Sequence, residues 1–81
     1  MNDRDTLSAL TDKVSQLRQH FPGRRIVVAR EGFAAVFERC EIGKDGVMIT
    51  ATPIEAGSTT LVIPWHPADY YLLVDEAQAT D

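Results

Sequence analysis

Apolar residues near the start of the chain recur every three or four positions. This spacing predicts an amphipathic helix over residues 3–20, because a helix completes one turn in about 3.6 residues. Asn2, Asp3 and Asp5 suit the N-terminus of a helix, and Pro22-Gly23 ends it. The apolar stripe consists of Leu7, Leu10, Val14, Leu17 and Phe21. We expect the stripe to pack on a core, although the same spacing also suits a helix-mediated dimer.

After Gly23 the pattern changes to short runs that are rich in β-branched residues or that alternate between apolar and polar positions. These runs predict strands over residues 24–30, 33–42, 47–52, 59–63 and 70–74. Glu31-Gly32 and Asp45-Gly46 are typical turn dipeptides between strands, and Pro53 restricts the third strand to a sheet edge or a bend. Pro64 and Pro67 predict a bend before the fifth strand. We expect residues 75–81 to be a frayed, acidic tail.

The order of these elements predicts the α+β class, with residues 1–81 as a single domain. An N-terminal amphipathic helix precedes an antiparallel meander of four or five strands. Two arrangements remain open at this point. The sheet is either open, with the helix packed across one face, or closed as a small barrel that removes its edge strands.

Two segments carry a resemblance to a known family. Residues 27–30 with Glu31-Gly32 resemble the first strand and turn of the Sm-like small barrel, a member of the broader SH3-like barrel class. Leu61 to Trp65, followed by residues 66–69, resemble its fourth strand and the one-turn link to its fifth. The resemblance spans residues 5–74 and implies a barrel with an N-terminal helix.

The RNA-binding motifs of that family are not matched. Sm-like RNA binders carry an Asp and an Asn beside the loop between strands two and three, whereas residues 43–48 of this chain contain no Asn. Their second motif places a basic or polar residue beside a Gly after the fourth strand, where this chain has Pro64-Trp65. The resemblance therefore implies a fold and not uridine recognition.

Composition adds limits to this interpretation. The chain has 81 residues, a formal net charge of −4 and 44% hydrophobic residues, so its core is thin and oligomerisation would supplement it. Cys40 has no second cysteine to pair with, which favours a reducing, cytoplasmic environment. Residues 1–5 do not look like a signal peptide, and no apolar run is long enough to span a bilayer. We expect no membrane association.

The charges are divided unevenly along the chain. Residues 1–30 hold six basic and three acidic side chains, a net +3, whereas residues 31–81 hold two basic and nine acidic ones, a net −7. Within the basic half, Arg24, Arg25 and Arg30 form a candidate contact for an anionic ligand. This corner is either a solvated edge, a contact for a nucleic-acid backbone, or a contact for the acidic face of another copy.

The strongest candidate for a partner-binding site is an aromatic segment near the C-terminus. Trp65, His66, Tyr70 and Tyr71 lie within seven residues, on both sides of the two-proline bend. Trp and Tyr are enriched at the energetic centres of protein interfaces. The alternative is that some of these rings close the end of the core. Tyr70 and Tyr71 are adjacent on a strand, so they point to opposite faces and at least one should lie outside the core.

No pattern in the sequence indicates catalysis, a cofactor or a metal site. Ser8, Ser15 and Ser58 lack the context of a catalytic nucleophile, and the spacing of His20, Cys40 and His66 is unlike that of zinc ligands. We therefore expect a small, non-catalytic protein-interaction module that acts by self-association or by docking on a larger protein. The alternative is a small barrel that binds RNA or single-stranded DNA.

Overall fold

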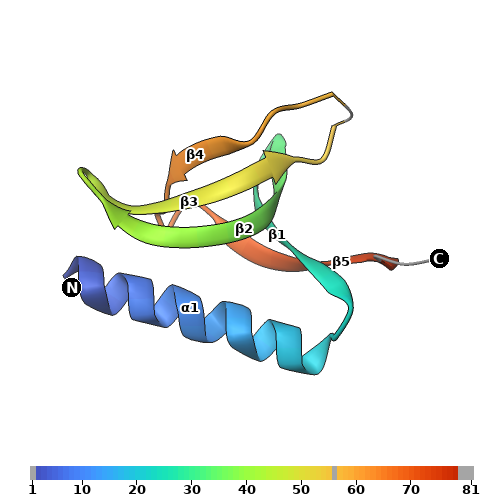
Figure 1. Cartoon of the computed structure of the whole chain (residues 1–81), viewed down its shortest axis with the longest axis horizontal. Coiled ribbons are helices and arrows are strands. Elements are labelled where there is room, and N and C mark those ends of the chain that lie inside the picture. Colours follow the sequence, from blue (N-terminus) through green and yellow to red (C-terminus); the bar gives the residue numbers. More distant parts are fainter. Residues whose placement is uncertain (1, 56, 79–81) are drawn as a thin grey trace.

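The computed structural model describes residues 2–55 and 57–78 of the chain. One helix precedes five antiparallel strands, which confirms the predicted α+β class (Figure 1). The elements are α1 (Asp3–His20), β1 (Arg24–Arg30), β2 (Phe33–Gly43), β3 (Gly46–Pro53), β4 (Leu61–Pro64) and β5 (Tyr71–Gln78).

Helix α1 has the predicted bounds, and its ends explain them. The Asn2 side-chain oxygen accepts a hydrogen bond of 2.8 Å from the backbone N–H of Asp5, one of the amides that a helix start leaves without a partner. At the other end, Phe21 caps the helix by donating its backbone N–H to Leu17 O. Phe21 itself is 43% exposed, so its predicted place in the buried stripe is wrong: it lies beyond the last helical turn.

The sheet has the strand order β4-β3-β2-β1-β5. Strands β1 to β4 pair antiparallel in sequence order, which confirms a meander of four strands, and β5 returns to the free side of β1. Strands β4 and β5 are the two edges. Within residues 2–55 and 57–78 no ladder joins these edges, and the structure therefore shows an open sheet with the helix across one face.

The strand bounds differ from the predicted ones mainly at the C-terminus. Residues 75–78 continue β5, so the prediction of a frayed tail is wrong there, and residues 79–81 lie outside the described residues. Strand β3 lies between β4 and β2, so the prediction from Pro53 that this strand is a sheet edge is wrong. Because β4 pairs with β3 only from Met48 to Ala51, Pro53 lies at a strand end that β4 does not reach.

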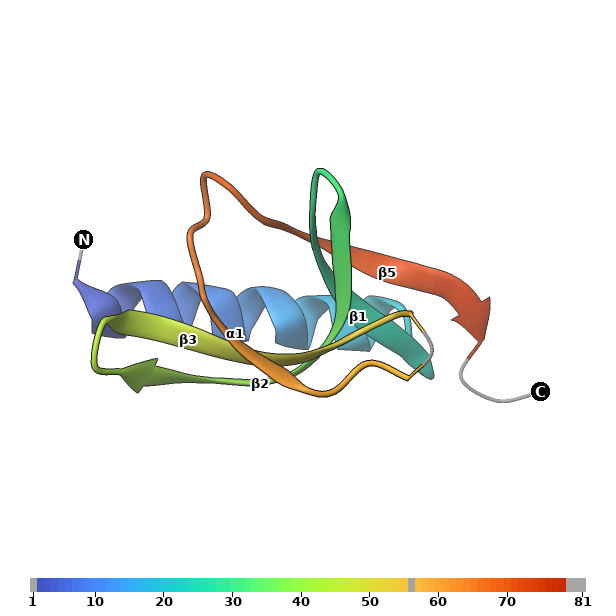
Figure 2. The ribbon, with the colours of Figure 1, turned by 90° about the horizontal axis from the view of Figure 1, so that it is seen from above.

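The core lies between α1 and the sheet face that it covers. Figure 1 shows the helix running along one side of the sheet, and Figure 2 shows the same two layers from above. Leu10 and Val14 are the buried residues of the helix, and Ile49 and Val28 are fully buried on the sheet. The buried cluster consists of Leu10, Val14, Ile26, Val28, Ala35, Phe37, Val47, Ile49 and Ala51.

Candidate interaction surface

The face of the sheet that α1 does not cover carries its own apolar side chains. Successive residues of a strand point to opposite faces, so Val27 and Ala29 point away from the helix-side cluster that holds Ile26 and Val28. The register places Val27 beside Val36 and Leu73, and Ala29 beside Ala34 and Tyr71. Ile54 extends the row, because its backbone N–H donates to Ala34 O at 3.2 Å. We name this surface the apolar strip: Val27, Ala29, Ala34, Val36, Ile54, Tyr71 and Leu73.

The strip is buried at its centre and open at its ends. Val27 is 4% exposed, whereas Ile54, Tyr71 and Leu73 are 49%, 52% and 47% exposed. A shallow depression of about 480 Å³ lies along it, with Ala34 among its lining residues. Single exposed apolar residues are common on protein surfaces, but a contiguous apolar patch with a polar border is typical of an interaction site.

Polar groups border the strip on one side. Arg25 and Asp75 form an ion pair across β1 and β5. Farther along the sheet, the Thr52 hydroxyl donates to the Glu38 carboxylate and lies 2.9 Å from the hydroxyl of Thr60. Glu38 is the extra residue where the β2–β3 register shifts, so a bulge directs its carboxylate to this border.

The predicted aromatic segment divides into core and surface residues. Trp65 and Tyr70 both pack against the core cluster, and their ring centroids lie 6.1 Å apart. His66 is exposed, and its carbonyl accepts the backbone N–H of Tyr70 at 3.0 Å in the turn before β5. Tyr71 lies on the apolar strip. The opposite placement of Tyr70 and Tyr71 is confirmed, but the four residues do not form one surface.

Trp65 also lines an apolar pocket of about 240 Å³ between α1 and the turn before β5. Leu10 and Leu72 form part of its wall, and Lys13 supplies its charged group. This pocket lies on the helix side of the sheet and is separate from the strip. It places Trp65, a predicted partner-binding residue, next to the helix.

The three predicted arginines are not brought together into one patch. Arg25 is engaged by Asp75, and the guanidinium of Arg30 lies over the ring of Tyr70, 5.2 Å from its centroid. Arg24 and Arg30 stand at opposite ends of β1. A contact for a phosphate backbone would need several cations on one face.

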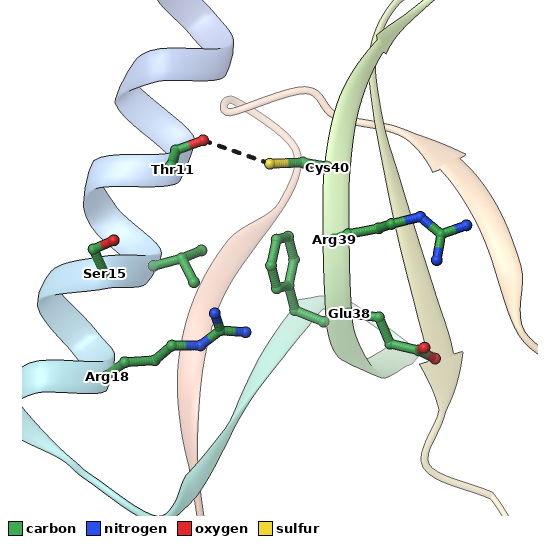
Figure 3. Close-up of a pocket in the computed structure, with 8 residues that line it drawn as sticks. Thr11, Ser15, Arg18, Glu38, Arg39 and Cys40 are labelled. Carbon is green, nitrogen blue, oxygen red and sulfur yellow. Dashed lines mark hydrogen bonds between the residues drawn. The ribbon is translucent and has the colours of Figure 1, made fainter.

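A second pocket, of about 260 Å³, lies between α1 and β2 (Figure 3). The Thr11 hydroxyl points toward the Cys40 sulfur at 3.7 Å, and the Arg18 guanidinium lies 5.9 Å from the centroid of the Phe37 ring. Figure 3 shows the Arg39 side chain turned away from the helix, so the two arginines do not converge. Cys40 is half-buried.

The residues that the structure describes contain no cluster of three or more His, Cys, Asp or Glu side chains that could hold a metal ion. Their helix is not long and apolar enough to cross a membrane. Comparisons with protein-family models, with curated proteins and with solved structures find no match to this chain.

Sequence reasoning missed most of the apolar strip, although one signal for it was present. Residues 26–29 form an uninterrupted apolar run, and such a run indicates a strand that is covered on both faces. The helix covers one face of β1. The other face is shielded by its neighbours Leu73 and Val36, and this shielding depends on a pairing that the local sequence does not reveal.

Proposed function

We propose that this chain is a small, non-catalytic protein-interaction module that acts by self-association or by docking on a larger protein through the apolar strip. The observation that carries the proposal is the half-exposed state of Ile54, Tyr71 and Leu73 on one continuous surface. Covering such side chains is favourable by about 25 cal/mol for each Å² of apolar surface removed from water. Self-association is the mode that can be tested on the chain alone.

Two further expectations belong to this proposal, and one alternative stands beside it. A cytoplasmic site of action is supported by the lone Cys40. The order of helix, five strands and the turn at residues 67–69 supports a likeness to the Sm-like and SH3-like small barrels. The alternative function, binding of RNA or single-stranded DNA, would have to use Arg24 and the already engaged Arg25 and Arg30.

Light scattering over a concentration series tests self-association directly. We expect the mass to rise above the 9.0 kDa of one chain as the concentration increases through the micromolar range. The variant Leu73→Lys places a charge at the exposed β5 end of the strip and should remain a monomer at concentrations where the native chain associates. A mass of one chain at every concentration would contradict self-association.

The matched control is Val62→Lys. Val62 is 60% exposed on β4 and pairs with Thr50, at the opposite edge of the sheet from the strip. A Lys at this position adds the same charge to the same kind of edge strand. We expect its mass to follow that of the native chain at each concentration. If both variants lose association equally, the cause is a general effect of the added charge and not a defined surface.

A further inference from the structure

The two edges of the sheet differ in how they are protected against pairing with another chain. Natural edge strands are commonly kept short or interrupted by proline, charge or a bulge. Strand β4 has only four residues and ends at Pro64, which has no N–H to donate. Strand β5 has eight residues, and its first four, Tyr71–Val74, contain no proline, glycine or charged residue. The unprotected edge is therefore β5.

Protection of β5 begins directly after this segment. The ladder between β1 and β5 is regular from Tyr71 to Val74, and its register then shifts at the level of Arg24 and Ile26. Asp75 lies at this irregularity and is engaged by Arg25. The acidic, irregular part limits regular pairing to the apolar segment Tyr71–Val74, which we name the β5 edge segment.

A strand added to this segment would cover apolar side chains on both faces of the sheet. Tyr71 and Leu73 are about half exposed on the apolar strip. Leu72 and Val74 are partly buried against the core cluster on the other face. The new strand would thus extend the strip and the core at the same time, which a molecule that merely lies on the strip could not do.

We propose that the β5 edge segment pairs antiparallel with the same segment of a second copy, so that two sheets join into one. This inference rests on the proposed function and names its partner and its contact. A two-fold axis makes the same edge serve both partners, and this closes the assembly after two copies. An assembly of β5 on β4 would instead be head-to-tail and would use the edge that ends at Pro64.

Two conditions select one register for this pairing: strip residues must lie opposite strip residues, and like charges must not lie opposite each other. With Leu73 opposite Leu73 of the second copy, Leu72 faces Val74, and Tyr71 faces Asp75, whose carboxylate can accept a hydrogen bond from the phenol. A shift by two residues in one direction brings Asp75 opposite Asp69, which lies in the turn before β5 and cannot extend the ladder, and like charges directly opposite are destabilising. A shift in the other places Leu73 opposite Asp75. The register centred on Leu73 avoids both conflicts.

Disulfide trapping in the full chain tests the contact. Cys40→Ser removes the only native thiol, and Leu73→Cys in that background places two thiols at the two-fold axis. Residues directly opposite in an antiparallel pair have Cα atoms about 4.5–5.5 Å apart, within the range that a disulfide spans. On mild oxidation we expect a covalent dimer on a non-reducing gel, and loss of that product when the chain is oxidised in urea.

The matched control is Val62→Cys in the same Cys40→Ser background, since Val62 is still more exposed and lies on the other edge. We expect no more dimer from it than from Cys40→Ser alone. A disulfide between the two cysteine variants when they are mixed would show the head-to-tail assembly of β4 on β5 and would overturn the inference.

A second measurement separates edge pairing from packing of strip against strip. Ile54 belongs to the strip but lies at its far end from β5. Edge pairing predicts that Ile54→Lys keeps the native mass while Leu73→Lys loses the dimer. Loss of the dimer in Ile54→Lys, or an associating chain that gives no Leu73→Cys product, would overturn the inference and leave the proposed function standing. A native chain that is monomeric at every concentration would overturn both.

Discussion

Tyr70 has a structural role at the end of the core. Its ring lies edge-on to Phe33, with centroids 6.4 Å apart, and packs beside Trp65. The Arg30 guanidinium covers the same ring. Contacts between aromatic rings contribute about 0.5–1.5 kcal/mol beyond the area that they bury. One side chain therefore connects the turn before β5 to the β1–β2 hairpin.

Replacing Tyr70 should weaken the fold more than replacing the exposed His66 of the same turn. We expect Tyr70→Ala to lower the free energy of unfolding by about 2–4 kcal/mol, because it removes both ring contacts and leaves a gap beside Trp65. His66→Ala, in the same turn, should change it by less than about 0.5 kcal/mol. Urea titrations followed by circular dichroism measure both values. Equal effects would contradict the division of this segment into core and surface residues.

This division could be predicted only in part from the sequence. The adjacency of Tyr70 and Tyr71 is enough to place them on opposite faces. Which of the two faces the core depends on the pairing of Tyr71 with Ala29, a contact between residues far apart in the chain. The same limit applies to Arg25, whose partner Asp75 lies fifty residues away and shares no local motif with it.

At the scale of elements, the N-terminal cap determines where α1 begins. The Asn2 side-chain oxygen accepts a hydrogen bond from the Asp5 backbone N–H, and the Asn2 carbonyl accepts one from the Thr6 N–H at 3.1 Å. Asp3 and Asp5 add negative charge in the first turn, where the helix dipole is positive. The helix supplies Leu10 and Val14 to the core, so fraying at its start weakens the cover of the sheet.

Removing the cap should therefore lower stability by a measurable amount. We expect Asn2→Ala to reduce the free energy of unfolding by about 1 kcal/mol, the usual cost of losing a capping side chain. Asn2→Asp keeps an acceptor oxygen at the same position and should stay near the native value. Thermal or urea unfolding monitored by helical ellipticity provides the comparison. A free energy of unfolding that is the same in Asn2→Ala as in the native chain would show that the cap does not contribute to stability.

The helix and the first hairpins could be predicted because their signals are local. Asn2 and Pro22-Gly23 delimit the helix, and Gly32 and Gly46 adopt the positive φ angles, 77° and 111°, that the two tight turns require. The position of β5 could not be predicted in this way. Its return to β1 pairs residues that lie far apart in the chain, and residues 75–78, which begin with two acidic side chains, resemble a tail when they are considered without β1 beside them.

At the scale of the whole molecule, the charge distribution argues against a phosphate-binding surface. The chain carries a net −4, and the basic residues of its first thirty positions are spread over the helix and both ends of β1. Two of the three candidate arginines are engaged within the fold.

We expect binding to single-stranded RNA or DNA to be negligible in a titration at physiological salt. Affinity driven by phosphate contacts falls steeply as salt increases, so a salt series distinguishes it from other binding. A salt-dependent affinity that disappears in the double variant Arg24→Glu, Arg25→Glu would favour the nucleic-acid alternative over the interaction module.

Amide hydrogen exchange tests the central claim, association through the β5 edge segment, most directly. Exchange is followed residue by residue in dilute and in concentrated native protein, with Leu73→Lys as the control that should not associate. We predict that the amides of Tyr71–Val74 that point away from β1 gain protection with concentration in the native chain only, while those of β4 exchange at a constant rate. Exchange at Tyr71–Val74 that does not depend on concentration, or protection gained at β4 instead, would contradict the account.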